Sequence, residues 1–280
     1  MADQQSYFDA FLTPDLHQME LSRGRPVIAY YGMIIETSAE LVYEQLRTIG
    51  RTARLDFLLN TRGGVATAAR ATALLLREYT DHLTILVPHR AWSAGTLICL
   101  GADELVLTPM SQLGPLDPRI GASTGVVQGG GSGILSAEDV KAFSRLAKDW
   151  YGIHDKSDLI QVLALLAQRV SPTSLGSFYR AELLIRDMAR ELLHYQLREK
   201  DADEIDTIVD RLVSGYHSHD YVITRADAER LGLRVTHALP AEEELLWSIV
   251  QALRYQTTAV PGADDTQSPC VVTSSRSLTE

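Results

Sequence analysis

Cysteine is nearly absent from the chain: Cys99 and Cys270 are the only two among 280 residues. Two cysteines this far apart form neither the disulfide framework of a small secreted domain nor a cluster of thiolate ligands. The His-x-His pattern at 217–219 has no second group of ligands at metal-binding spacing. We therefore expect a reducing compartment and neither a metal nor another cofactor.

Positive charge and long apolar runs are also scarce. The chain has 26 Lys and Arg against 36 Asp and Glu, a formal net charge of −10, which argues against sequence-independent binding of nucleic acid or anionic lipid. There is no apolar run long enough for a membrane span, and the first residues lack the basic start and apolar centre of a signal peptide. We expect a cytoplasmic protein with no membrane span.

What the sequence does contain is an alternation of strand and helix patterns. Short, near-continuous apolar runs, typical of buried parallel strands, fall at 26–31, 55–59, 83–87 and 105–107. Helical patterns lie between them at 39–49, with Ser38 as the expected cap, at 66–79 and at 93–101. This alternation predicts an α/β fold of repeated βαβ units with a parallel sheet.

After residue 107 the pattern changes. Glycine and proline punctuate residues 108–133, which predicts a long loop. A helical C-terminal half is then predicted, with helices at 137–150, 156–169, 175–200, 202–213 and 241–255. Residues 221–235 predict a strand, a capped helix, a glycine stop and a strand.

These patterns give a domain organisation. We expect an N-terminal extension at 1–24 and one domain at 25–256. Residues 257–280 are rich in Ser, Thr, Pro and Asp and lack periodicity, which predicts a flexible tail.

Two turns between a strand and a helix carry the residues of greatest chemical interest. Gly63 and Gly64 follow the strand at 55–59, and Ser93 follows the strand at 83–87. Ligands of parallel sheets bind outside the carboxyl ends of the strands, so both turns are expected to face one pocket. Backbone N–H groups of Gly63, Gly64 and Ala94 would there stabilise an oxyanion beside the Ser93 hydroxyl. A helix cap at Ser93 and a tight turn at the glycines are the structural alternatives.

Five motifs occur in the order of a known family. They are Asn-Thr-Arg-Gly-Gly-Val-Ala-Thr-Ala at 60–68, Ala-Trp-Ser-Ala-Gly-Thr at 91–96, Gly-Ala-Asp-Glu-Leu-Val-Leu-Thr-Pro at 101–109, Ser-Gln-Leu-Gly-Pro-Leu-Asp-Pro at 111–118 and Ser-Gly-Tyr-His-Ser-His-Asp-Tyr-Val-Ile-Thr at 214–224. Over roughly residues 25–237 the chain resembles the Clp-protease and crotonase superfamily. Within that superfamily it is similar to the serine dehydrogenase proteinase family, which is related to signal peptide peptidase A.

The resemblance implies a Clp/crotonase-like fold and the activity of a serine endopeptidase. Its nucleophile would be Ser93, with oxyanion donors at Gly63, Gly64 and Ala94. The implied substrate is a peptide or protein. The implied assembly is a homo-oligomer, such as a trimer, a hexamer or a larger ring.

The general base has several candidates. The Clp proteolytic subunit has a histidine after its serine, but residues 111–120, which correspond to that stretch, contain none. The aspartate of the Clp triad has a counterpart in Asp220. Relatives of signal peptide peptidase A use a lysine, and Lys141 and the weaker candidate Lys148 fall in the matching interval. A lysine base requires burial that lowers its pKa, and Lys141 adjoins apolar positions of its predicted helix.

Histidine is the other candidate base. His217 and His219 lie just before Asp220, and a histidine beside an aspartate suits a base and the group that orients it. Of the two, His219 is the stronger candidate. A local turn held by Asp220, or a solvated surface lysine in the case of Lys141, is the structural alternative.

Two other functions fit the same fold. A crotonase-type enzyme would use the paired N–H groups to hold the enolate of an acyl-CoA thioester, although Ser93 and the Gly-Pro-Leu-Asp-Pro loop at 114–118 argue against it. A catalytically inactive scaffold or interaction protein would keep the fold for assembly alone.

Overall fold

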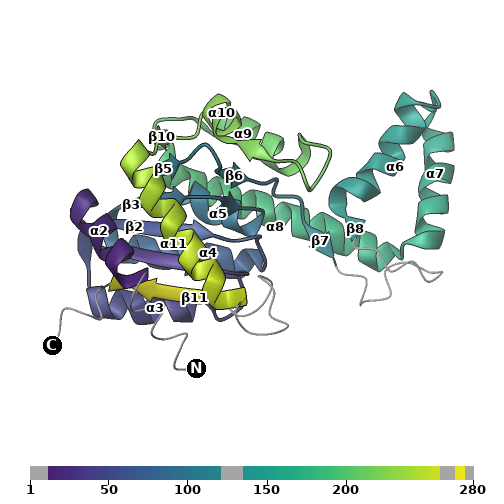
Figure 1. The fold of residues 1–280 in the computed structure, drawn as a ribbon. Coiled ribbons are helices and arrows are strands. Elements are labelled where there is room, and N and C mark those ends of the chain that lie inside the picture. The colour runs from purple at the N-terminus through teal and green to yellow at the C-terminus, as the bar shows by residue number, and fades with distance from the viewer. Residues whose placement is uncertain (1–11, 121–134, 259–268, 275–280) are drawn as a thin grey trace. The chain divides into compact units, whose positions relative to one another are not determined.

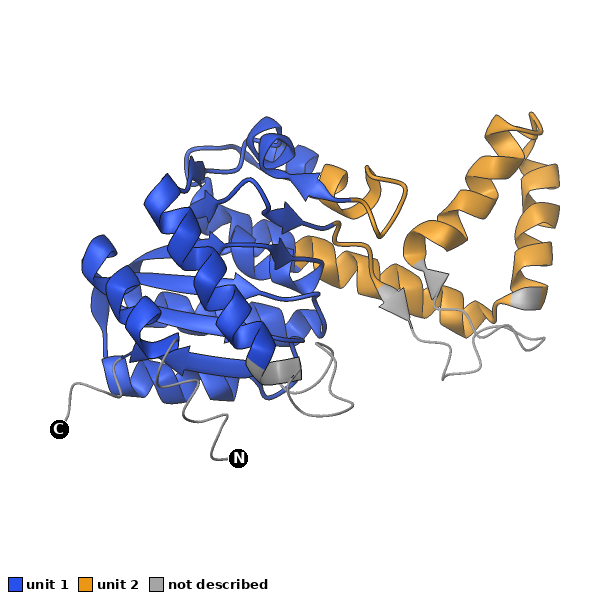
Figure 2. Cartoon of the chain, viewed as in Figure 1, with its two compact units in different colours: residues 1–114, 188–208, 222–280 blue, residues 115–187, 209–221 orange. Residues whose placement is uncertain are grey.

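The computed structural model describes residues 12–120, 135–258 and 269–274, which form two compact units (Figure 2). Unit 1 comprises residues 1–114, 188–208 and 222–280, and unit 2 comprises residues 115–187 and 209–221. The predicted domain at 25–256 thus contributes to both units. Residues 121–134, the later part of the predicted glycine-rich loop, lie outside the described residues.

Unit 1 is built on a six-stranded sheet in the order β10-β5-β3-β2-β1-β11. Its strands are β1 (Val27–Tyr31), β2 (Thr52–Asn60), β3 (Thr80–Val87), β5 (Glu104–Leu107), β10 (Val235–His237) and β11 (Cys270–Thr273). In this sheet, β10, β5, β3, β2 and β1 each pair in parallel with the next strand in the order, and β11 pairs antiparallel with β1. The predicted parallel sheet is confirmed, and its apolar strands reflect burial on both faces.

Helices cover both faces of this sheet (Figure 1). The predicted helices after the first three strands are confirmed as α3 (Ser38–Ile49), α4 (Ala66–Glu78) and α5 (Ala94–Leu100). The opposite face is covered by α2 (Thr13–Arg23) and α11 (Pro240–Thr258), which pack on alternate strand residues such as Ala29 and Leu58. The N-terminal segment predicted as an extension therefore contributes to the core through Leu12, Leu16 and Met19.

A small second sheet lies in the same unit. It joins β4 (Arg90–Ala91), β6 (Gln112–Leu113) and β9 (Ile223–Thr224). From β9 the chain enters α10 (Arg225–Arg230), where Thr224 and Asp227 form a capping box, and then reaches β10. The predicted strand, capped helix and strand are confirmed, and Gly232 supplies the positive φ of 84° at the predicted stop.

Two local predictions are corrected. Ser38 is the first helical residue instead of the cap, and its hydroxyl accepts a hydrogen bond from the Ile35 N–H at 2.8 Å and lies 2.7 Å from the Tyr30 hydroxyl. β11 lies within the segment predicted as a flexible tail, which is wrong for residues 270–273. Hydrogen bonds to β1, which is far away in the sequence, stabilise this strand, and the local sequence pattern does not indicate them.

Unit 2 is mainly helical. It holds the antiparallel pair β7 (Arg119–Ile120) and β8 (Leu135–Ser136), followed by α6 (Ala137–Asp149) and α7 (Lys156–Arg169). Parts of α8 (Pro172–Gln196) and α9 (Ala202–Ser214) complete it. The predicted helical C-terminal half is confirmed. Within the described ranges, no helix of the chain is long and apolar enough to cross a membrane.

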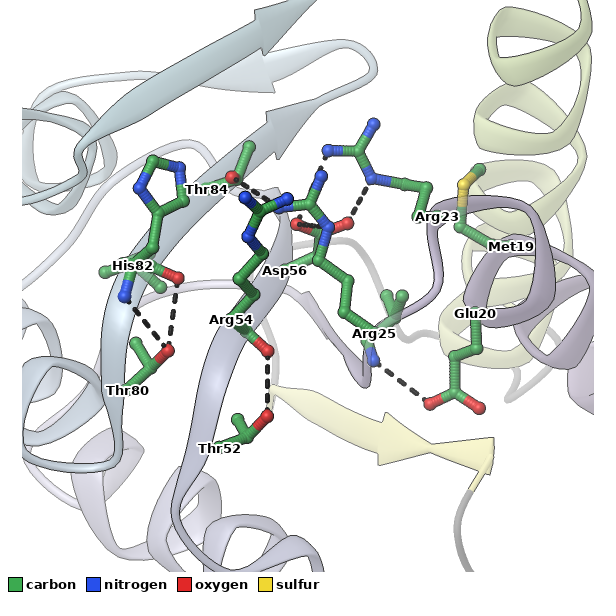
Figure 3. Close-up of polar contacts among 12 residues, drawn as sticks. Met19, Glu20, Arg23, Arg25, Thr52, Arg54, Asp56, Thr80, His82 and Thr84 are labelled. Carbon is green, nitrogen blue, oxygen red and sulfur yellow. Dashed lines mark hydrogen bonds and ion pairs between the residues drawn. The ribbon is translucent and has the colours of Figure 1, made fainter.

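A buried carboxylate ties α2 and α11 to the sheet. Asp56 of β2 is fully buried, and its carboxylate accepts a hydrogen bond from the Arg23 side chain and pairs with Arg25 at 3.3 Å (Figure 3). Arg23 in turn pairs with Glu242 of α11 at 2.6 Å. An isolated charge at this position would be very unfavourable, so the two arginines are what allow it.

Candidate active site

Hydrogen bonds hold the two predicted turns side by side. The Thr61 N–H donates to the Arg90 carbonyl at 2.8 Å, and the Trp92 N–H donates to the Thr61 carbonyl at 3.2 Å. The side-chain oxygen of Asn60 also accepts from the Arg90 N–H at 3.0 Å. The segments that follow the carboxyl ends of β2 and β3 are thus joined by hydrogen bonds, and Gly63 and Ser93 lie next to each other beyond these strand ends.

Gly63 lies directly against the serine turn. A Cβ atom at this position, where φ is 107°, would lie 2.9 Å from the Trp92 carbonyl oxygen and 3.0 Å from the Ser93 Cβ. The Gly63 N–H donates to the Thr61 hydroxyl at 3.0 Å. Only glycine permits this approach, and its N–H is already used within the turn.

Gly64 differs from Gly63 in the direction of its N–H. The Ile34 N–H donates to the Gly63 carbonyl and the Val65 N–H donates to the Ile34 carbonyl, both at 2.8 Å. In a parallel bridge of this kind the N–H of the central residue points away from the partner strand. Within the part of the chain that the structure describes, the Gly64 N–H has no hydrogen-bond acceptor.

Ser93 occupies a strained backbone position between β4 and α5. Its φ is 49° and its ψ is −112°, a region that L-residues rarely adopt. Its half-buried side chain makes no capping hydrogen bond to α5, so the structure gives no support to the helix-cap alternative. A serine on a sharp, strained turn from strand to helix has the backbone setting in which α/β-hydrolases place a serine nucleophile.

The motif at 111–118 supports this turn from the other side. The Thr96 hydroxyl lies 2.7 Å from the Ala91 carbonyl oxygen, to which it can donate, and accepts from the Gly114 N–H at 2.9 Å. A Cβ at Gly114 would lie 3.2 Å from the Ser93 nitrogen. Sequence reasoning did not single out Thr61 or Thr96. The signal for Thr96 was a hydroxyl inside an otherwise small and apolar motif, because a buried hydroxyl needs a partner.

The close contact at Gly64 gives a prediction for stability. A Cβ there would lie 2.0 Å from the Ile34 carbonyl oxygen, and φ is 141°. We expect Gly64→Ala to lower the free energy of unfolding by roughly 3 kcal/mol, measured by chemical denaturation. The matched control is Gly176→Ala in α8, where an added Cβ meets nothing within 4 Å; it should stabilise by about 0.5–1 kcal/mol. Equal free energies of unfolding for the two variants would show that the close contact at Gly64 does not require glycine.

The candidate lysine bases lie in unit 2. Lys141 is half-buried on α6, with its Nζ 2.5 Å from a Glu182 oxygen and 3.3 Å from a Glu138 oxygen. Burial alone would raise the pKa of Glu182, but hydrogen bonds from Lys141 and Arg186 outweigh it and lower that pKa. Lys148 is exposed. Lys141 therefore lies in an ion-pair cluster, not in the apolar surroundings that a neutral lysine requires.

The candidate histidines also lie in unit 2, on a turn after α9. The rings of Tyr216 and Tyr221 stack across this turn with centroids 4.4 Å apart, and the Asp220 N–H donates to the Ser218 hydroxyl at 3.3 Å. His219 is half-buried and Asp220 is exposed. Both line a cavity of about 840 Å³ within unit 2. In the described segments, no group of three or more His, Cys, Asp or Glu side chains is arranged to hold a metal ion.

The comparison with known families matches the part of the chain that carries this site. Residues 17–129 match the family model of the ClpP-like SDH-type serine proteinases, which confirms the resemblance over that range. The match includes Gly63, Gly64, Ser93 and Ala94. It ends before Lys141 and His219.

Similar proteins exist in an archaeon. Two uncharacterized proteins of Methanocaldococcus jannaschii are 28% and 29% identical to the chain over 226 and 227 residues. The matched regions cover 80% and 81% of this chain, and 66% and 68% of the relatives.

Among solved structures, two variants of the 1510-N membrane-bound stomatin-specific protease are similar. One is a serine-to-alanine variant, 17% identical with a TM-score of 0.43, matching 76% of this chain and 77% of its own. The other is a lysine-to-alanine variant in complex with a substrate peptide, 16% identical with a TM-score of 0.44, matching 77% of this chain and 75% of its own.

Proposed function

We propose that the chain is a serine endopeptidase that cleaves peptide bonds through an acyl-enzyme on Ser93. The observation that carries the proposal is the conformation of the Ser93 turn. Ser93 has a positive φ, its side chain makes no capping hydrogen bond, and the turn lies at the carboxyl ends of two parallel strands. The family match over residues 17–129 adds support. In this mechanism the Ser93 Oγ attacks the carbonyl carbon, the C–N bond breaks, the amine leaves with a proton, and water hydrolyses the ester.

The oxyanion hole in this proposal uses the N–H groups of Gly64 and Ala94. Ala94 begins α5, so its N–H lacks an intrahelical acceptor and lies next to the nucleophile. The Gly64 N–H is also without an acceptor in the described structure, whereas the Gly63 N–H donates to Thr61. We assign Gly63 to the close approach of the two turns. Two preorganised donors stabilise the developing negative charge of the tetrahedral intermediate.

A fluorophosphonate probe tests the proposal directly. Such a probe phosphonylates only an activated serine, and peptide mapping by mass spectrometry locates the adduct. We expect one adduct, on Ser93. The heat-denatured protein is the control and should remain unlabelled. An intact, folded protein that does not react would overturn the peptidase function.

The same probe distinguishes the candidate bases. Because Glu182 and Glu138 hold Lys141 in an ion-pair cluster, we propose His219, oriented by Asp220, as the base. We expect His219→Gln to lower the labelling rate by roughly 10³-fold, while Lys141→Met leaves it within about threefold. The reverse ranking would assign the base to Lys141. Lys148→Met is the surface control. Circular dichroism of each variant separates loss of the base from loss of the fold.

One observation favours a second candidate function. Glu138 and Glu182 hold the Lys141 side chain at 3.3 Å and 2.5 Å, and if no other group serves Ser93 as a base, the same fold would act as an inactive scaffold. A scaffold predicts no labelling of Ser93 and unchanged assembly of Ser93→Ala.

We further propose, from the resemblance, a cytoplasmic homo-oligomer that acts on peptides or unfolded proteins. Light scattering coupled to size-exclusion chromatography measures the assembly. A mass equal to 30.9 kDa at all concentrations would exclude the oligomer.

A further inference from the structure

The cavity in unit 2 has a wall that the proposed peptide-bond chemistry does not use. Its volume is about 840 Å³, which is within the range of binding cavities. One wall is an outward face of α6 and the residue after it, formed by Asp139, Ala142, Phe143, Leu146, Asp149 and Trp150. The spacing of these residues follows the helical period, so they line one side of the helix.

Aromatic rings are exposed on this wall. Trp150 is 81% exposed and Phe143 is 36% exposed. The described core cluster of unit 2 centres on Ala137, Val170 and Phe178, and neither ring belongs to it. Exposed rings next to a cavity are typical of a surface that binds a ligand.

The described lining of the cavity contains more acidic than basic side chains. Carboxylates come from three separate segments: Asp117 before β7, three acidic residues of α6, and Asp220 in the turn after α9. Among the described residues of the lining, Arg145 is the only arginine or lysine; it pairs with Glu138 at 2.7 Å, and Lys141 pairs with the same carboxylate at 3.3 Å. An excess of carboxylates over cationic side chains in the lining of a cavity attracts a cationic ligand.

Aromatic faces and carboxylates together select one chemistry. Lysine and arginine side chains stack on rings through cation–π contacts and form charge-assisted hydrogen bonds with carboxylates. Their aliphatic stems pack on apolar groups such as Ala142 and Leu146. We propose that this cavity binds a lysine- or arginine-rich segment of the polypeptide substrate. The inference rests on the proposed peptidase function, because it names the class of polypeptide that is recruited.

Binding is tested without cleavage in the Ser93→Ala variant of the full chain. A fluorescently labelled peptide with alternating lysine and leucine is titrated against it, and anisotropy reports binding. A peptide with glutamate in place of lysine is the matched control and should not bind. Binding of the lysine peptide should weaken by about tenfold when salt is raised from low to physiological ionic strength.

Two substitutions separate charge from aromatic contact. Asp149→Asn should weaken binding about threefold and Trp150→Ala about fivefold. Asp158→Asn, an exposed acid on α7 outside the cavity, should leave binding unchanged. Equal binding by all three variants, or of both peptides, would overturn the proposal. Probe labelling of Ser93 in the wild-type chain is scored separately, so failure of the cavity and failure of the peptidase function give different results.

Discussion

Ser93→Ala is expected to reduce peptidase activity and fluorophosphonate labelling by roughly 10³-fold or more, because no other group in the turn replaces the nucleophile. The reason is local. Ser93 lies between the end of β4 and the first N–H groups of α5, and removal of its oxygen leaves the oxyanion donors with no covalent intermediate to stabilise. Alanine keeps the Cβ and therefore keeps the backbone strain. The free energy of unfolding should change little, as denaturant titration will show.

Ser93→Gly is a second variant that separates stability from activity. If Ser93 had only a structural role, its replacement would not raise stability while abolishing activity. Glycine adopts a φ of 49° without the cost that a Cβ imposes. Relief of about 1–3 kcal/mol of strain, offset by about 0.5–1 kcal/mol of extra chain entropy, predicts a gain of about 1 kcal/mol in stability. Activity should fall as far as in Ser93→Ala. If glycine does not stabilise the fold, the strain assigned to this turn is wrong.

The sequence predicts the frame of this site well. Apolar runs bounded by turn residues identify the strands that end at Asn60 and Val87, because burial on both faces leaves a local signature. The capped helix predicted within residues 221–235 is also a local feature, and in the structure Thr224 and Asp227 form its cap.

What the sequence does not predict depends on contacts between distant segments. Gly63 and Gly114 pack closely against the turn in which Ser93 has its positive φ, and no local pattern encodes these contacts. β11 is a four-residue edge strand in a polar segment, and only its partner β1 reveals it. Ser38 has the side chain of a cap, but Tyr30 and Ile35 bind its hydroxyl instead. Local cap propensity is overridden by a buried partner.

Asp56 was not singled out from the sequence, although its position carries a signal. The run Leu-Asp-Phe-Leu-Leu at 55–59 places an acid in an otherwise apolar strand. Charged side chains are almost never fully buried without a partner, so the run implies a buried cation nearby. Arg23 and Arg25, just before the neighbouring strand, are that partner.

Asp56→Ala is expected to lower the free energy of unfolding by roughly 4 kcal/mol, the second large effect that we predict. The loss exceeds that of the hydrogen bonds alone, because Arg23 and Arg25, only 9% and 14% exposed, would be left without their carboxylate. Arg23 keeps its contact with Glu242, so α2 stays joined to α11 while its ion pair with β2 is lost. Hydrogen exchange should therefore show the largest loss of protection in α2.

Asp81→Ala is the matched control, because it removes a carboxylate that forms an ion pair with an arginine at the protein surface. Arg51 and Asp81 are 2.7 Å apart and 66% and 67% exposed, so water replaces the lost contact and the loss should stay below about 1 kcal/mol. Asp56→Asn keeps the shape and one acceptor but removes the charge, and its loss should fall between those of the two alanine variants. If Asp56→Ala costs no more than Asp81→Ala, water reaches the arginines in the folded state, and burial is not what makes this ion pair important.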